Sequence, residues 1–420
     1  MPQFIINLKT LYKDMDRADQ ILVTLVALTF FSFPIGTAPP LILIITAFVV
    51  FLASGKFLGV RKLWNDHKVS PLFKKVMSEN WIFPLFLFLL LPWIGLIYVP
   101  EISDVSMDYA RKTHYWLYAF VVALLPLDKR VISFIVKAFI AGLLVNSIFA
   151  FIQFAGLAPA PSPSGIQGYF GFGVIYSALS MYLVSAIMMA SFFFKYAKTK
   201  QIKALNILLI FIFLFHISIM DGRNGYVTFF VLSPFIAINV IGRFDWKKVT
   251  FICIVFLIAM SFSPVLKNRI TTTFANMRAN QQTILEQPWN TNVIHIAPRF
   301  YLLRAALDLF LEHPVIGAGT GGYRYYIEKE GAIPLHSHPH NNILYMVASF
   351  GILGLFSYFW LCWVMFRKSW QHRDEIQGYF ALSILLVIFI SGFFNSQIID
   401  SGPALFFALG YGLLNHMRCD

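Results

Sequence analysis

Long apolar runs recur along the whole chain, and short polar segments separate them. Examples are residues 81–99, 172–194 and 379–394. Inside a lipid bilayer the backbone finds no water to pair with, so a run that crosses it must be a helix or a strand of a closed barrel. Barrel strands alternate polar and apolar positions, whereas these runs are apolar on every face. The pattern therefore predicts an all-α polytopic membrane protein.

The apolar runs predict about twelve transmembrane helices. The predicted spans are residues 20–37, 39–58, 81–99, 115–127, 131–154, 172–194, 204–219, 225–241, 249–262, 342–366, 379–395 and 402–417. They divide the chain into three parts. Residues 1–262 hold the first nine helices, residues 263–341 form one long loop, and residues 342–420 hold the last three helices.

The long loop contains a helical pattern of its own. Apolar residues recur at helical spacing within residues 299–313, namely Phe300, Leu303, Leu307, Phe310 and Leu311. Pro298 stands where this helix would begin, and Pro314 follows its end. The first half of the loop, residues 266–285, is polar and is a candidate for a helix on the membrane face. A folded loop on one face of a helical bundle is where function usually concentrates.

The positions of lysine and arginine predict the orientation of the chain. They cluster in the short connections, and with twelve crossings every cluster falls on one face, so we expect both termini to be cytoplasmic. Composition supports the membrane assignment, because 58% of the 420 residues are apolar and only 13% are charged, too few to cover a soluble protein. Membrane topology also explains the net charge of +13, so nucleic acid is not an expected partner.

A histidine cluster stands where the long loop re-enters the membrane. It comprises His336, His338 and His340 and is followed by Asn341. A neutral imidazole can take a proton from a hydroxyl near neutral pH, which favours a general base. Three histidines can also bind a catalytic metal, but no acidic residue or cysteine stands beside them. A third interpretation is a set of interfacial histidines that only bond loop backbone. We favour the base and expect no metal or other cofactor.

Arginines on the same predicted face are candidates for binding an anion. Arg223 lies at the outer end of a predicted span, where an ionised group is costly unless it faces a cavity or a partner such as Asp221. Arg299 and Arg304 lie on the loop helix, and Arg304 can instead pair with Asp308 one turn away. Arg299 is therefore the stronger candidate. Several guanidinium groups on one face form a natural phosphate clamp.

A glycine-rich segment at residues 317–322 does not indicate nucleotide chemistry. It lacks the lysine and the spacing of a phosphate-binding loop. We expect it to form a tight turn after the loop helix, because glycine adopts backbone conformations closed to other residues.

The motif around the histidines resembles that of O-antigen ligases and related bacterial polymerases. It consists of His340 and Asn341, nine further residues, and then Gly351-Ile352-Leu353-Gly354. The preceding His338-Pro339, the outer-face Arg223 and the segment 299–319 fit the same family. The resemblance implies a glycosyltransferase of the GT-C fold type in the bacterial inner membrane, with its active site on the periplasmic face.

The resemblance also implies the substrates and the roles of the candidate residues. The donor would be an undecaprenyl-pyrophosphate-linked glycan and the acceptor the lipid A–core oligosaccharide of lipopolysaccharide. A histidine would take the proton of the acceptor hydroxyl, for which we favour His338 with His340 in support, and Asn341 and His336 would assist. Arg223, Arg299 and Arg304 would stabilise the leaving pyrophosphate. Transfer would then be inverting and independent of metal.

Other functions fit parts of the pattern. A polymerase of glycan repeats or a protein O-oligosaccharyltransferase would share the donor and differ only in the acceptor. A flippase or transporter would also have a dozen helices among membrane lipids. It would, however, show paired ionisable residues midway along helices or two similar halves, and the sequence shows neither.

Overall fold

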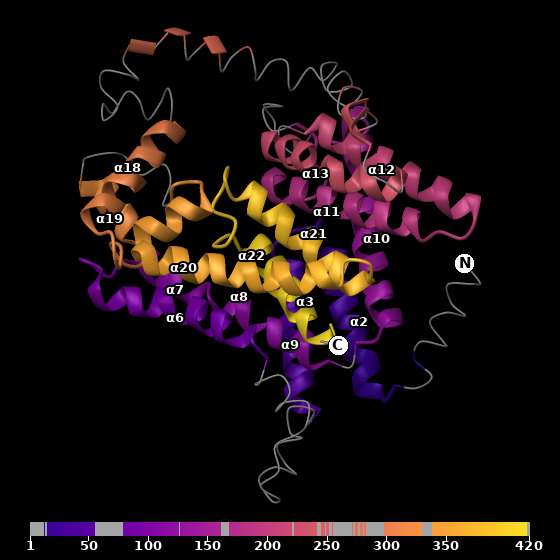
Figure 1. Ribbon diagram of the computed structural model, residues 1–420, viewed down its shortest axis with the longest axis horizontal. Helices are drawn as coiled ribbons and strands as arrows, with labels where there is room; N and C mark the ends of the chain where they lie inside the picture. The colour runs from indigo at the N-terminus through magenta and orange to yellow at the C-terminus, as the bar shows by residue number, and fades with distance from the viewer. Residues whose placement is uncertain are drawn as a thin grey trace, which may run out of the picture.

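The chain folds into a bundle of helices (Figure 1). The computed structural model describes residues 12, 15–54, 79–125, 127–160, 168–220, 222–241, 245–247, 249–251, 254, 271, 274–275, 278–279, 281–282, 298–329 and 338–417. The helices of the first half are α2 (Arg17–Ser32), α3 (Ala38–Ala53), α6 (Ile82–Tyr98), α7 (Asp104–Arg111), α8 (His114–Leu117), α9 (Ala119–Leu124), α10 (Lys129–Phe154), α11 (Tyr176–Lys195), α12 (Lys200–Ile219) and α13 (Arg223–Ile241). The helices of the second half are α18 (Pro298–Glu312), α19 (Gly322–Lys329), α20 (Asn342–Gln371), α21 (Ile376–Ser391), α22 (Ser401–Gly412) and the 3-10 helix η1 (Leu413–His416).

The described residues contain helices and no strand, which agrees with the prediction of an all-α polytopic membrane protein. Among the described residues, five helices are long and apolar enough to cross a membrane, namely α10, α11, α12, α13 from its second residue onward, and α20. The shorter helices α3, α6 and α21 are also apolar. The predicted span 249–262 and the candidate helix 266–285 lie mostly outside the described residues. The count of twelve spans therefore stays a prediction.

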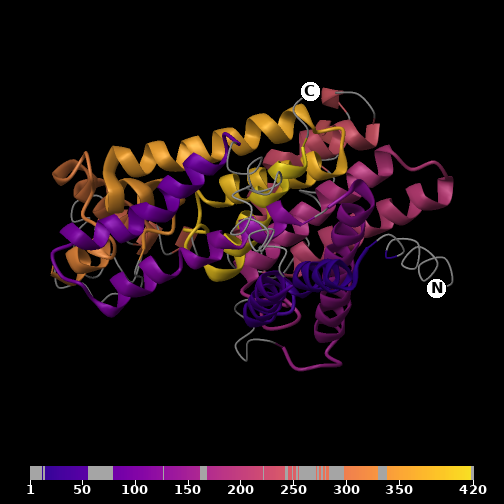
Figure 2. The same cartoon turned by 90° about the horizontal axis from the view of Figure 1, so that it is seen from below.

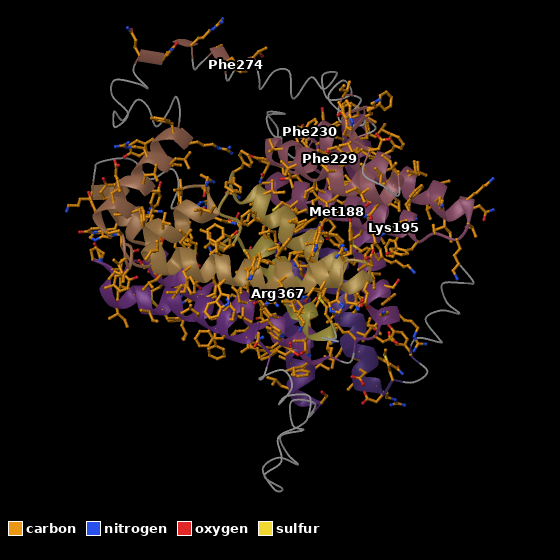
Figure 3. The ribbon with its side chains drawn as sticks, in the orientation of Figure 1. Met188, Lys195, Phe229, Phe230, Phe274 and Arg367 are labelled. Atoms are coloured by element: carbon orange, nitrogen blue, oxygen red, sulfur yellow. The ribbon has the colours of Figure 1, made fainter. Side chains whose placement is uncertain are left out.

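The centre of the bundle is formed by α11 and α22, which are buried on nearly every face. An aromatic cluster joins them to α2, α10 and α21, with ring centroids 5.0–6.4 Å apart. Its members are Phe30, Phe33, Phe139, Tyr182, Phe380 and Phe406. Figure 3 labels Met188 of α11 with Phe229 and Phe230 of α13, in the region where these two helices pack. Each such aromatic pair contributes about 0.5–1.5 kcal/mol beyond its burial.

The fourth predicted span, residues 115–127, is divided between α8 and α9 rather than forming one helix. Carbonyl groups near the end of α9 receive hydrogen bonds from the C-terminal segment. Asn415 Nδ2 donates to Ala123 O at 2.7 Å, and His416 Nε2 donates to Val122 O at 2.8 Å. These contacts replace the bonds that a continuing helix would make, because buried carbonyls need a partner.

The helix predicted in the long loop is confirmed as α18, which begins at Pro298 and ends before Pro314. A glycine turn follows it, as expected, and Gly317 adopts a left-handed φ of 69°. The turn packs on a break in α20 at Gly351, where φ is 61° and ψ is −150°. Across this break Ala318 N–H donates to Ala348 O at 2.9 Å. The motif glycine therefore opens α20 so that the loop can dock on it, and Figures 1 and 2 show α18 and α19 beside the first part of α20.

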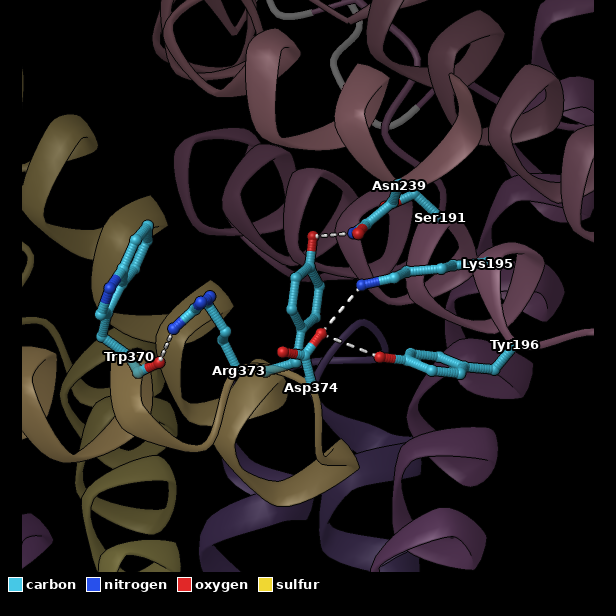
Figure 4. Close-up of polar contacts among 8 residues, drawn as sticks. Ser191, Lys195, Tyr196, Asn239, Trp370, Arg373 and Asp374 are labelled. Atoms are coloured by element: carbon cyan, nitrogen blue, oxygen red, sulfur yellow. Dashed lines mark hydrogen bonds and ion pairs between the residues drawn. The ribbon is translucent and has the colours of Figure 1, made fainter. Parts of the chain in front are cut away.

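Ion pairs gather at what we call the basic end of the bundle, the set Glu79, Lys129, Lys195, Lys368, Asp374 and Glu375. Lys368 Nζ lies 2.6 Å from Glu79 Oε2, and Lys129 Nζ lies 2.7 Å from Glu375 Oε2. Figure 4 shows Lys195 and Tyr196 both directed at Asp374. All six residues come from segments that the charge pattern assigns to one face of the membrane, so their meeting agrees with that assignment.

Candidate functional site

A cavity of about 340 Å³ draws together side chains that are far apart in the sequence. It is lined by Ile175, Tyr176, Ser177, Asn224, Arg299, His338, His340, Phe394, Asn395 and Asp400. These residues come from the starts of α11, α13 and α18, from the segment before α20, and from the connection between α21 and α22. The structure thus brings together Arg299, His338 and His340, three of the residues singled out from the sequence.

The histidine segment is fastened to the connection between α21 and α22. Asn341 N–H donates to Ser396 Oγ at 3.1 Å, and Asn341 Nδ2 donates to Phe393 O at 3.2 Å. Asn341 Oδ1 also caps α20 by accepting Leu344 N–H at 3.0 Å. His340 has a left-handed φ of 52°, a strained conformation for a residue with a side chain. These contacts stabilise the strained backbone conformation of His340. The side chain of Asn341 is thereby used for hydrogen bonds to backbone groups.

A chain of two hydrogen bonds sets the proton position on His340. Asn395 Nδ2 donates to Asp400 Oδ2 at 2.9 Å, and Asn395 Oδ1 lies 2.8 Å from His340 Nδ1. A carboxylate only accepts, so the amide nitrogen must face Asp400 and the amide oxygen must face the imidazole. His340 therefore donates from Nδ1. In the neutral ring this leaves the lone pair on Nε2.

His338 has the opposite arrangement. Its Nδ1 accepts the backbone N–H of His340 at 3.3 Å, so its neutral ring carries the proton on Nε2. The two ring centroids are 4.4 Å apart and the rings are inclined at 65°. One imidazole thus keeps a basic nitrogen and its neighbour keeps a donor.

Asp400 lies in the connection between α21 and α22, outside both helices. Burial removes its carboxyl from water and raises its pKa to about 6, because an ionised carboxylate is poorly solvated there. The hydrogen bond from Asn395 and the positive charge of Lys112 lower the pKa but do not cancel this effect. The carboxyl therefore changes charge close to neutral pH.

The arginines fall into two groups. Arg299, the second residue of α18, lines the cavity and is exposed. Arg304 lies further along α18 and does not line it. Arg304 Nε pairs with Asp308 Oδ1 at 3.2 Å, which is the alternative weighed for it from the sequence. The structure therefore brings Arg299, and not Arg304, to the histidines.

Arg223 begins α13, immediately before Asn224 in the cavity wall. The structure describes its backbone only, and Asp221 lies outside the described residues. The start of α13 packs closely on α11, since a Cβ at Gly225 would lie 2.6 Å from Ser180 Cβ. Glycine is thus required at that contact, and the role of Arg223 stays a prediction.

The histidine cluster was also considered as a metal site. No group of three His, Cys, Asp or Glu that could hold a metal occurs among the described residues. His336, the third histidine of the cluster, lies outside them. The expectation that no metal is needed stays a prediction.

Seven of the ten lining residues were not singled out from the sequence, and they include the polar residues Asn224, Asn395 and Asp400. Asn395 and Asp400 stand in the short, partly polar segment between the last two apolar runs, which was the available signal. Their relation to His340 depends on a hydrogen bond across 55 residues that no local pattern reveals. Asn224 adjoins Arg223, and only the three-dimensional fold shows that it lines the cavity.

Comparison with known families bears on this site. Residues 205–359 match the family model described as O-Antigen ligase. The matched segment includes Asn224, Arg299, His338 and His340, and it ends before Asn395 and Asp400. The search of curated proteins found no match. The resemblance predicted from the histidine motif is thereby confirmed.

Proposed function

We propose that this membrane protein, whose residues 205–359 match the family model described as O-Antigen ligase, is an O-antigen ligase. It would transfer a glycan from undecaprenyl pyrophosphate to the lipid A–core oligosaccharide and so complete lipopolysaccharide. The observation that supports this best is the cavity that gathers Arg299, His338 and His340 from distant segments. The proposal includes a GT-C fold with about twelve spans in the inner membrane, cytoplasmic termini and a periplasmic cavity.

His340 is the general base in this proposal, the reverse of the assignment favoured from the sequence. The hydrogen bond to Asn395 leaves Nε2 of His340 unprotonated, whereas Nε2 of His338 carries a proton. Nε2 of His340 takes the proton of the acceptor hydroxyl as its oxygen attacks the anomeric carbon. The bond from that carbon to the pyrophosphate oxygen breaks, and its electron pair leaves with the lipid pyrophosphate. Attack opposite the leaving group inverts the anomeric carbon.

Positive charge and donors stabilise the departing pyrophosphate in this mechanism. Arg299 reaches the cavity from α18, and Arg223 begins the adjacent helix α13. Nε2–H of His338 supplies a further donor. Fixed cations aimed at developing negative charge do the work that a divalent metal does in other transferases, so we propose a metal-independent reaction. Arg304 is assigned to its ion pair with Asp308 and not to the substrate.

The test is transfer by the purified protein in lipid nanodiscs. Undecaprenyl-pyrophosphate-linked glycan and lipid A–core are supplied together, with and without a chelator. The expected product is glycan joined to lipid A–core in both conditions, and it should disappear in His340→Ala. A longer lipid-linked glycan with no transfer to lipid A–core would make the protein a polymerase. Absence of both products from a folded preparation would overturn the proposal.

A further inference from the structure

Asn224 is a buried amide whose polar atoms have no partner in the described part of the chain. The residue is 8% exposed and lies in the cavity wall with His340 and Arg299. Neither Nδ2 nor Oδ1 makes a hydrogen bond within that part of the chain. Buried amides are almost always paired, because leaving one unpaired forfeits its bonds to water. An unpaired amide in the wall of a binding cavity therefore indicates a ligand that completes it.

The chemistry of the amide restricts what that ligand can be. Asn224 has two N–H donors and one carbonyl acceptor to satisfy. An ionised pyrophosphate only accepts, so it would leave Oδ1 without a donor. A sugar ring carries hydroxyl or acylamino groups that both donate and accept. Tyr176 and Ser177 stand in the same wall and add hydroxyl groups suited to a sugar.

The position of Asn224 identifies which sugar it would meet. It follows Arg223 at the start of α13, and Arg299, the other proposed pyrophosphate arginine, lines the same cavity. The sugar bonded to the pyrophosphate must lie between those arginines and His340, the base. We propose that Asn224 binds this first sugar of the donor, through the hydroxyl or acylamino group next to its anomeric carbon. The inference rests on the proposed function and extends it to donor specificity.

Thr228 provides a matched control on the same helix. It lies one turn beyond Asn224, is fully buried, and its Oγ1 also lacks a partner among the described residues. It does not line the cavity. Removing its hydroxyl tests what loss of an unpaired polar atom from α13 does by itself. Asn224→Leu and Thr228→Val keep nearly the size of the residues that they replace.

The experiment measures binding without an acceptor, so it does not depend on transfer. Two short-chain polyprenyl-pyrophosphate sugars are used, identical except that one lacks the substituent next to the anomeric carbon. Wild type should bind the complete sugar about tenfold more tightly, as expected for one or two neutral hydrogen bonds. The preference should vanish in Asn224→Leu and remain in Thr228→Val. Asn224→Ala serves as a second variant if the leucine variant does not fold.

The outcomes separate the inference from the function on which it rests. An equal preference in wild type and in the Asn224 variants overturns the inference, as does a wild type that binds both sugars equally. A preference lost only in the Asn224 variants supports it. If that preference is found but wild type transfers glycan to no acceptor, the proposed function fails and the sugar-binding role of Asn224 stands.

Discussion

The cavity and the basic end of the bundle both contain clusters of polar side chains, but the two clusters differ in how their hydrogen bonds are satisfied. Helix α13 carries an asparagine toward each. Asn239 donates to Tyr379 Oη at 2.7 Å and to Ser191 Oγ at 3.3 Å (Figure 4). Asn224 is equally buried and makes no hydrogen bond within the described residues. Polar groups that form their hydrogen bonds within the chain hold helices together. Polar groups that line a cavity without such bonds are available to a ligand.

The charged residues of the two regions show the same difference. At the basic end Lys195 Nζ and Tyr196 Oη each donate to Asp374 Oδ1 at 2.9 Å. The positive charge of Lys195 therefore neutralises the carboxylate of Asp374. At the cavity Asp400 is held by an amide, and its pKa is raised to about 6. Structural pairs keep acids ionised, because a nearby cation favours the charged form. A site that performs proton transfer benefits from groups that titrate near neutral pH.

The largest expected effect comes from removing the base. His340→Ala should lower the rate of glycan transfer about 1,000-fold, within the range that a positioned general base contributes. Lys195→Ala at the basic end should change it by less than about twofold, since a partly exposed ion pair contributes little. Initial rates per folded protein measure both. Equal losses in the two variants would show that the cavity has no special role.

The next effect tests the hydrogen bond that sets the proton position on His340. Asn395→Leu removes it and should lower kcat about 100-fold, comparable to the loss when a partner that orients a histidine is removed. KM for the donor should change little, because Asn395 is not assigned to binding. Steady-state kinetics with varied donor separate the two constants. A raised KM with an unchanged kcat would instead assign Asn395 to the substrate.

Helices could be predicted from the sequence wherever local signals act alone. Helix α18 begins at Pro298 and ends before Pro314 because its apolar period and its breakers are local. The end of α9 at Leu124 depends partly on non-local bonds, because Asn415 and His416 at the far end of the chain donate to the carbonyls of Ala123 and Val122.

The same limit applies to the site. The histidines and Arg299 stood out by type and clustering, so they could be named from the sequence. Asn395 and Asp400 could not be, since a single asparagine or aspartate between apolar runs has no marked pattern. Asn224 stands out only because it is buried without a hydrogen-bond partner among the described residues. That property depends on the packing of every neighbouring helix and cannot be predicted from local sequence.

A smaller effect is expected from pH, through Asp400. Below pH 6 its carboxyl is protonated and can donate to Asn395, so the amide can turn its nitrogen toward His340 and remove the lone pair from Nε2. Through Asp400 alone, transfer should therefore fall about tenfold per pH unit below about pH 6, and protonation of the base His340 adds a loss that Asp400→Asn retains. A pH–rate profile of kcat measures this. The Asp400→Asn variant should have a low kcat across the whole pH range. Its pH–rate profile should lack the decrease that Asp400 causes below about pH 6.

The same pKa predicts the opposite trend for stability. Asp400 has a pKa of about 6 in the folded protein and an ordinary, lower value when unfolded. The unfolded chain therefore releases this proton first, and stability falls as pH rises from about 4 through 6. Asp400→Asn should raise the melting temperature at pH 7.5 relative to wild type while transfer falls. A lower melting temperature for this variant would show that the carboxylate stabilises the fold.

The smallest effect on transfer, and the sharpest test of the comparison, comes from one substitution made at both ends of α13. Asn239→Leu breaks two hydrogen bonds and leaves Tyr379 Oη without its amide donor, so the free energy of unfolding should fall by about 1–3 kcal/mol. Transfer per folded protein should stay within about twofold of wild type, since Asn239 is remote from the cavity lining. Asn224→Leu removes an amide that bonds nothing in the described residues, so stability should be unchanged or higher. Thermal unfolding in nanodiscs compares the two variants directly. If Asn224→Leu destabilised the protein as much as Asn239→Leu, Asn224 would be a structural residue and the distinction between the two ends of the helix would fail.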